Sequence, residues 1–235
     1  MAITDVPVDS GSTSTGGATS LTPALAGTAT AGNLLVCGAS VDAGVTAFVT
    51  PSGWTAADNY EGAAIAGANF YKVSDGTETN AAISWGNSRA ASAWILEFDS
   101  TDIDTGTAPL LAEDESNVST VVTTQSSGTT SATTVADALA IATYSSDAMA
   151  TVFVGRSYTT DYTERMQVGS SSSTRPGSMV ATSVRSSTGA QSCTFTTTDT
   201  GDEMYGQILV FQGSGAGGGF QPVWAYNAGN NIGFM

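Results

Sequence analysis

The chain of 235 residues contains no histidine and only six basic residues, of which Lys72 is the single lysine. Without histidine, Ser-His-Asp and Cys-His nucleophilic catalysis is excluded, as are metal sites built from imidazole. The 21 carboxylates leave a formal charge of −15, and such an acidic surface does not attract phosphate backbones. We therefore expect neither nucleic acid nor an anionic membrane as a partner.

Long apolar runs are also missing. No stretch approaches the roughly 18 apolar residues that cross a bilayer, and the start MAITDVPVDSGSTSTGG lacks the basic and apolar regions of a secretory signal. Helical periodicity is missing too, because apolar residues do not recur at spacings of three and four, and glycine or threonine interrupts every long window. The sequence therefore indicates a chain without spanning helices, signal peptide or helical domain.

Paired carboxylates are the one catalytic arrangement that the composition leaves open, since two of them suffice for glycoside hydrolysis. Of the available glutamates, Glu97 is expected to point outward from a strand and Glu78 follows a turn; the others are Glu61, Glu113 and Glu203. No motif fixes their geometry, so we predict no enzymatic activity and no catalytic residue.

An acidic segment, Asp102 to Gly106 with Glu113 beyond it, is superficially similar to a calcium loop. Its glycine falls at position five instead of six, and a prolyl-leucine run replaces the polar ligands. We interpret the segment as a solvated loop and expect no metal and no cofactor. A looser calcium site among Asp99, Asp102 and Asp104 stays open at this point.

Short runs of β-branched, aromatic and leucine residues, each closed by Gly, Asn, Asp or Ser, fill the stretch from 31 to 100. These are the signals of strands and turns. LLVCGAS is typical of a central strand buried on both faces, and in WILEF the residues Trp94, Leu96 and Phe98 share one face while Ile95 and Glu97 share the other. The prediction is an all-β chain, folded as an antiparallel β-sandwich of the jelly-roll-like kind.

A second series of strands echoes the first. ALAIA matches LLVCGA, Met179 to Val184 matches NFYKV, Ser192 to Thr196 matches AISW, and QILVF matches WILEF. The offset grows from 105 residues at Leu34/Leu139 to 113 at Phe98/Phe211. Two half-sandwiches of similar design, packed or interleaved, explain this echo, although generic β alternation could also mimic it.

The echo gives a domain plan. Residues 1–30 form an extended segment whose Ser/Thr/Gly tract, Asp9 to Ser20, shows no hydrophobic period; a first edge strand follows near Leu21 and Leu25. Residues 31–212 form the sandwich, with halves at about 31–100 and 118–212. Residues 213–235 form a glycine hinge and an aromatic C-terminal arm.

Two cysteines, Cys37 and Cys193, each fall inside an expected strand. We interpret them as two buried free thiols that behave as small hydrophobic side chains. A disulfide between the halves is the alternative, since spacing alone does not exclude it.

Aromatic residues give two sets of candidate binding residues. The arm that follows GSGAGGG would be costly to leave in water, so it either docks on a neighbouring subunit or folds back on its own sandwich. Its candidate partner-docking residues are Phe220, Trp224, Tyr226 and Phe234. Four loop aromatics could stack on sugar rings or anchor loops, namely Trp54, Tyr60, Tyr158 and Tyr162.

The pattern AGNLLV, PSGW, FYKVSDGTET, ISWG and WILEFDS resembles a β-sandwich domain that recurs in virion proteins of tailed bacteriophages. The match covers residues 30–100 well and 118–212 more weakly, and the closing FQPVWAYNAGNNIGFM is similar to aromatic C-terminal tails on some of these proteins. The resemblance implies a structural component of the tail tip, tail fibre or capsid decoration, often without enzymatic activity.

From this resemblance and the composition we expect a homo-oligomeric structural protein that assembles in the host cytoplasm and works on the outside of a virion. Its expected partners are other virion proteins. The alternatives are a head-decoration protein and a carbohydrate-binding module that attaches to host-surface glycans.

Overall fold

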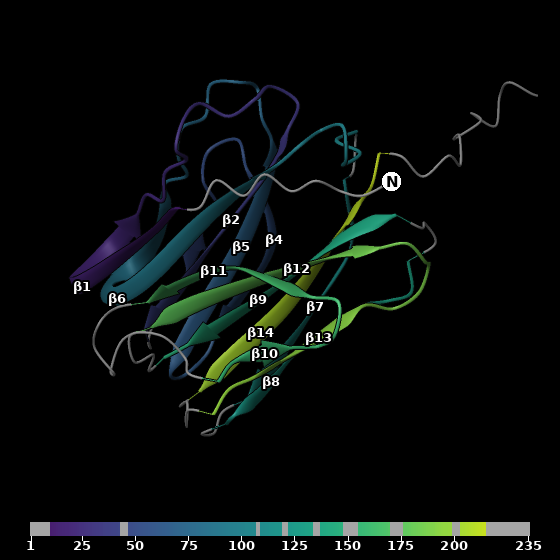
Figure 1. Cartoon of the computed structure of the whole chain (residues 1–235). Coiled ribbons are helices and arrows are strands. Elements are labelled where there is room, and N and C mark those ends of the chain that lie inside the picture. Colours follow the sequence, from purple (N-terminus) through teal and green to yellow (C-terminus); the bar gives the residue numbers. More distant parts are fainter. Residues whose placement is uncertain are drawn as a thin grey trace, which may run out of the picture.

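The fold was derived from a computed structural model that describes residues 10–42, 47–106, 109–118, 122–133, 137–147, 155–169, 176–198 and 203–214. Within these ranges every regular element is a β-strand, and all strand pairs are antiparallel (Figure 1). The predicted all-β sandwich is therefore confirmed. None of the described residues belongs to a helix long and apolar enough to cross a membrane.

The first half of the chain builds one sheet, in the order β1-β6-β2-β5-β4, with β3 paired to β6. Its strands are β1 (Ser10–Leu21), β2 (Leu34–Asp42), β3 (Phe48–Val49), β4 (Thr55–Glu61), β5 (Ile65–Val73) and β6 (Ile83–Phe98). Central strand β2 is buried along almost its whole length, as its continuous apolar pattern predicts.

The second half builds two sheets. The larger has the order β11-β12-β9-β14-β7, and the smaller has the order β10-β13-β8. Their strands are β7 (Leu110–Val118), β8 (Thr124–Thr129), β9 (Ala138–Ser146), β10 (Ser157–Tyr158), β11 (Thr163–Gly169), β12 (Gly177–Arg185), β13 (Ser192–Thr196) and β14 (Met204–Gln212).

The two halves repeat one strand order. Reading β6-β2-β5-β4 in the first half against β14-β9-β12-β11 in the second, each strand has a counterpart. Leu34 of β2 lies between Val73 and Phe98, and Leu139 of β9 lies between Val184 and Phe211. These registers place the strands at offsets of 105, 111 and 113 residues, in agreement with the offsets read from the sequence.

A shared irregularity strengthens this correspondence. The ladder of β4 and β5 shifts between Ala56 and Asp58, and the ladder of β11 and β12 shifts between Glu164 and Met166. Both shifts lie at an offset of 108 residues and skip one residue each, Ala57 and Arg165. A β-bulge is a specific local feature, so its recurrence at one equivalent position indicates a repeated unit.

Three clusters of buried side chains hold the layers together. The central cluster lies between the two large sheets and contains Leu34, Val36, Trp94, Leu96, Phe98, Ile103, Leu139, Ile141, Met166, Val168, Val180, Leu209 and Phe211. The first outer cluster covers the other face of the first sheet and contains Leu25, Ala29, Leu35, Cys37, Ala39, Val41, Phe48, Ala66, Ala68, Phe70, Ala81, Ile83, Trp85, Ala91, Ala93 and Ile95.

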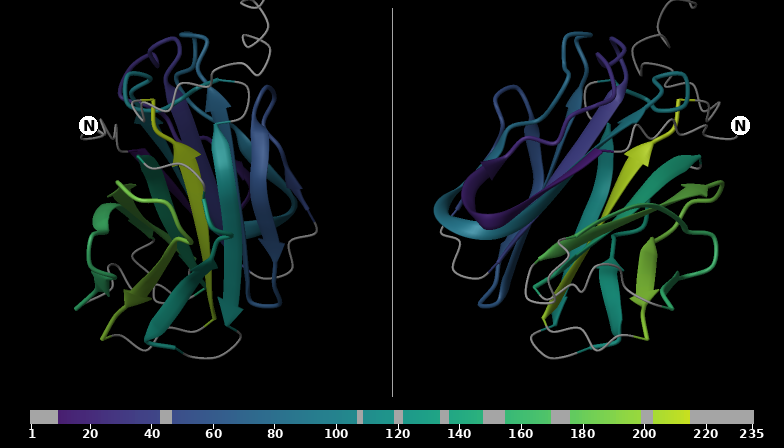
Figure 2. Two further views of the ribbon diagram at one scale, coloured as in Figure 1. Left: turned by 90° about the vertical axis from the view of Figure 1, so that its right-hand side faces the viewer. Right: turned by 60° about the vertical axis from the view of Figure 1, so that its left-hand side comes forward.

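The second outer cluster lies between the second large sheet and the small sheet. It contains Ala138, Ala140, Ala142, Tyr144, Tyr162, Met179, Ala181, Cys193, Phe195, Met204, Ile208 and Val210. Figure 2 shows the purple and blue first half beside the green and yellow second half. The halves are therefore packed against each other, with one shared cluster between them and one cluster within each.

Polar side chains also cross the interface between the halves. The hydroxyl of Ser40 donates to that of Ser145 at 2.5 Å, and these two residues are themselves related by the offset of 105. Asn69 donates to Thr143 at 3.0 Å and to Gln207. Buried polar groups need such partners, so these bonds favour one relative placement of the two sheets.

The structure adds detail to the sequence-based expectation at one place and departs from it at another. The Ser/Thr/Gly tract near the N-terminus, which has no hydrophobic period, lies largely in β1 (Ser10–Leu21) and pairs with the long strand β6. Glu97 does not reach solvent; it is 8% exposed, and its Oε1 accepts hydrogen bonds from Thr30 N at 2.8 Å and Asn33 Nδ2 at 2.7 Å. It does point away from the central cluster, but that face of the sheet is covered.

The two cysteines are free and buried. Cys37 belongs to the first outer cluster and Cys193 to the second, on opposite sides of the molecule. A disulfide between them is excluded by this separation, and burial raises the pKa of both thiols.

Candidate functional site

The four loop aromatics do not gather at one place. Trp54 packs at the edge of the first outer cluster, whereas Tyr158 and Tyr162 pack in or against the second. Tyr60 stacks on Tyr205 with ring centroids 4.6 Å apart and an angle of 10° between the planes. Each ring has an intramolecular packing role, and Tyr162 also lies next to Arg185, a lining residue of the pocket described below.

Trp54 and Tyr162 occupy equivalent turns. The N–H of Trp54 donates to the carbonyl of Pro51 at 3.0 Å, and the N–H of Tyr162 donates to that of Thr159 at 3.1 Å. The residue before each aromatic has a positive φ, 79° at Gly53 and 81° at Asp161. Aspartate tolerates this conformation less readily than glycine does, so the second turn keeps a carboxylate at some conformational cost.

The candidate docking residues Phe220, Trp224, Tyr226 and Phe234 lie outside the described residues. The prediction that the arm docks on a neighbour therefore rests on the sequence alone. The described chain approaches the hinge at Gly213, which forms a bridge with Ile103, and at Ser214, whose N–H donates to Asp102 at 2.9 Å.

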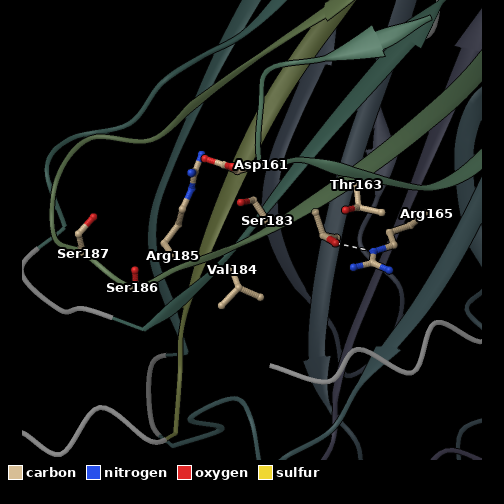
Figure 3. A pocket seen from close by; sticks show the side chains of 9 residues that line it. Asp161, Thr163, Arg165, Ser183, Val184, Arg185, Ser186 and Ser187 are labelled. Atoms are coloured by element: carbon tan, nitrogen blue, oxygen red, sulfur yellow. Dashed lines mark hydrogen bonds between the residues drawn. The ribbon is translucent and has the colours of Figure 1, made fainter. Parts of the chain in front are cut away.

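A polar pocket of about 530 Å³ lies where β11 begins and β12 ends (Figure 3). It is lined by Asp161, Thr163, Arg165, Thr182, Ser183, Val184, Arg185, Ser186 and Ser187. The pairing of β11 with β12 starts at Thr163 and Thr182, so the last residues of β12 extend beyond their neighbour on this side. This geometry leaves the strand end open to a ligand.

The lining residues of β12 fall into two groups because side chains alternate along a strand. Thr182 and Val184 share a face with Val180 of the central cluster, and Arg165 donates from Nε to the Thr182 hydroxyl at 2.6 Å. Ser183 and Arg185 share the opposite face with Ala181 of the second outer cluster.

The Ser183 and Arg185 side of the pocket contains unused hydrogen-bond donors. Ser183 is 3% exposed, and among the described residues neither its Oγ nor the Nε of Arg185 has a hydrogen-bond partner. The guanidinium carbon of Arg185 lies 4.8 Å from the ring centre of Tyr162. Burial raises the pKa of Tyr162, and the neighbouring Arg185 opposes that rise. In Figure 3 the Arg185 side chain extends toward Asp161, with Ser183 beside it.

Carboxylates are scattered rather than gathered into a metal centre. In the described part of the chain no group of three or more Asp, Glu or Cys side chains could hold a metal ion. The Oδ1 atoms of Asp99 and Asp104 accept hydrogen bonds from backbone N–H groups two residues on, Thr101 and Gly106. Burial and the nearby Asp58 and Asp114 raise the pKa of Glu113.

Sequence reasoning missed the pocket. Its residues belong to a short turn and to the end of a strand, and no motif links them. The signal that could have found it is the alignment of the two halves, which sets Asp161 against Gly53 and Arg185 against Ser74. Comparison of the chain with known family models, curated proteins and solved structures found no match.

Proposed function

We propose that this chain is a non-enzymatic structural protein on the exterior of a tailed-phage virion, a tail-tip or tail-fibre component. In this account it assembles in the host cytoplasm with other virion proteins and with further copies of itself. Head decoration is the alternative position in the particle.

The observation that supports the proposal is where the phage-like residues lie. AGNLLV leads into and begins β2, PSGW forms the turn before β4, FYKV ends β5, and ISWG and WILEF begin and end β6. Together they make one structural unit, and the chain repeats that unit. The resemblance therefore rests on core and turn residues of a building block, which is what a shared structural module would retain.

The sheets also offer places for assembly. Strands β1 and β4 end the first sheet, and β7 and β11 end the larger second one. An end strand carries unpaired backbone groups that an extended segment can join by strand addition. In the proposal the aromatic arm, with Phe220, Trp224 and Tyr226 as anchors, provides such a segment to a neighbouring subunit.

Quantitative mass spectrometry of purified virions tests the proposal. We expect the chain in the particle at a handful of copies, the number typical of a tail tip or fibre. Hundreds of copies would move it to the capsid surface, and its absence from the particle would overturn the virion role.

A second candidate function is attachment to host-surface glycans. The observation that favours it is the polar pocket beside Tyr162, which combines hydroxyl, guanidinium and carboxylate groups at an open strand end. Sugar-binding sites draw on these groups together with a nearby aromatic ring.

A further inference from the structure

We propose that the Ser183 and Arg185 side of the pocket binds the carboxylate of an acidic sugar, such as a uronic acid. This inference rests on the glycan-binding role given above as the second candidate and is independent of the assembly role. Its main argument comes from the first half of the chain, where the equivalent position already holds a carboxylate.

Strand registers define the equivalent residues. Lys72 lies opposite Leu35 in β2, and Ser183 lies opposite Ala140 in β9, at the offset of 105 that relates these two strands. Two residues further on, Ser74 corresponds to Arg185. Each strand end therefore carries one cation and one hydroxyl on the same face, in opposite order.

In the first half these two groups hold the carboxylate of Glu78. Lys72 forms an ion pair with Glu78, and the Ser74 hydroxyl donates to the other carboxylate oxygen at 2.7 Å. Burial alone would raise the pKa of Glu78, but hydrogen bonds from Lys72, from Ser74 and from the backbone N–H groups of Asp75 and Glu78 together outweigh it and lower the pKa to about 2. Lys72 and Ser74 thus already form a carboxylate-binding site within this protein.

In the second half the turn that follows the strand does not supply that carboxylate, and the acidic residue of the pocket, Asp161, comes from the turn before β11. The turn after Arg185 reads Ser-Ser-Thr-Gly and contains no acidic residue. It is also two residues shorter, since seven positions separate Val73 from the bridge at Asn80, and five separate Val184 from the matching bridge at Gly189. The turn of the second half therefore has no residue that corresponds to Glu78.

The unused donors at this place call for an acceptor from outside. Buried donors without a partner are rare because each one carries a desolvation cost, and donors beside a guanidinium favour an anionic acceptor. A carboxylate held by Ser183 and by the guanidinium of Arg185 would reproduce what Glu78 does for the first half.

The remaining lining favours a sugar over an acidic peptide. Asp161 would repel additional negative charge but accepts hydrogen bonds from neutral hydroxyls, and Ser186 and Ser187 add further hydroxyl partners. Val184, which is 41% exposed, offers an apolar contact to the C–H face of a ring. With a net charge of −15, the chain tolerates a single carboxylate more readily than a polyanionic segment.

To test this, the full chain is titrated separately with methyl glucuronide, methyl glucoside and acetate. Binding is measured by NMR or calorimetry. We expect the glucuronide to bind at least about tenfold more tightly than either of the others. Arg185→Gln should lower that affinity by roughly tenfold or more, Ser183→Ala by a smaller factor, and Arg185→Lys should restore part of the loss. Arg89→Gln removes the same charge from an exposed position of the first half and should leave binding unchanged.

Other outcomes separate this inference from the function on which it rests. Equal binding of glucoside and glucuronide, unaffected by Arg185→Gln, would keep a glycan-binding role and overturn the carboxylate site. Binding of an acidic peptide or of a second copy, lost in Arg185→Gln while the glucuronide is ignored, would replace the sugar by a protein partner. Failure of every probe to bind would contradict both.

Discussion

Replacing Gly206 with alanine is expected to destabilise the protein by about 3 kcal/mol or more. A Cβ at this position would overlap the backbone carbonyl oxygen of Ser126 and would lie 3.1 Å from the ring of Tyr144. The carbonyl is part of β8 and cannot rotate away, so β14 and the small sheet would have to separate at a well-packed contact. Urea unfolding followed by tryptophan fluorescence measures the loss.

Gly27→Ala is the matched control for this prediction. Apart from Gly27 and its two chain neighbours, no atom of the described residues lies within 4 Å of the position that its Cβ would take. We expect its unfolding free energy to remain within about 0.5 kcal/mol of the parent value. Equal midpoints for the two alanine variants would show that β8 does not pack on β14 as described.

Truncation of Trp94 to alanine is expected to cost about 4 kcal/mol, the second large effect. Trp94 is 2% exposed and lies in the central cluster, which residues of both halves share. The cavity would therefore weaken both halves at once, and unfolding should remain a single transition at a lower urea concentration.

Trp54→Ala provides the comparison, since this tryptophan is half-buried and only packs at the rim of the first outer cluster. Its expected cost is about 1 kcal/mol. If the parent protein unfolded in two separate transitions, the central cluster would not couple the halves. If both tryptophans cost the same, the assignment of Trp94 to the shared core would be wrong.

The strands of the sandwich could be read from the sequence because their signals are local. Alternation in WILEF assigned Trp94, Leu96 and Phe98 to one face, and they lie together in the central cluster. The growing offset between the two series likewise anticipated the registers of Leu34 and Leu139. Hydrophobic periodicity and turn residues can be read in a short window of sequence, and the repeat is found by comparing such windows with one another.

Features that depend on distant partners could not be read in this way. The tract before Leu21 has no strand pattern of its own and becomes β1 through its pairing with β6. Glu97 is buried because Thr30 and Asn33, more than 60 positions earlier, supply its hydrogen bonds. Strand propensity says little about such tertiary partners.

The pocket was hidden for a similar reason. Ser183 and Arg185 look like ordinary strand-end residues, and their interest arises only from comparison with Lys72 and Ser74, which hold Glu78. That comparison requires the registers of both halves. An internal repeat thus becomes a source of functional inference once its two copies can be aligned residue by residue.

The central claim of the proposed function is that the C-terminal arm assembles copies of this chain. The most direct test is the mass in solution of the full chain and of a version that ends at Ser214, the last described residue. The account predicts a multimer for the full chain and a folded monomer for the shortened one. Monomers of equal stability in both cases would contradict it and would leave the arm without a role in self-assembly.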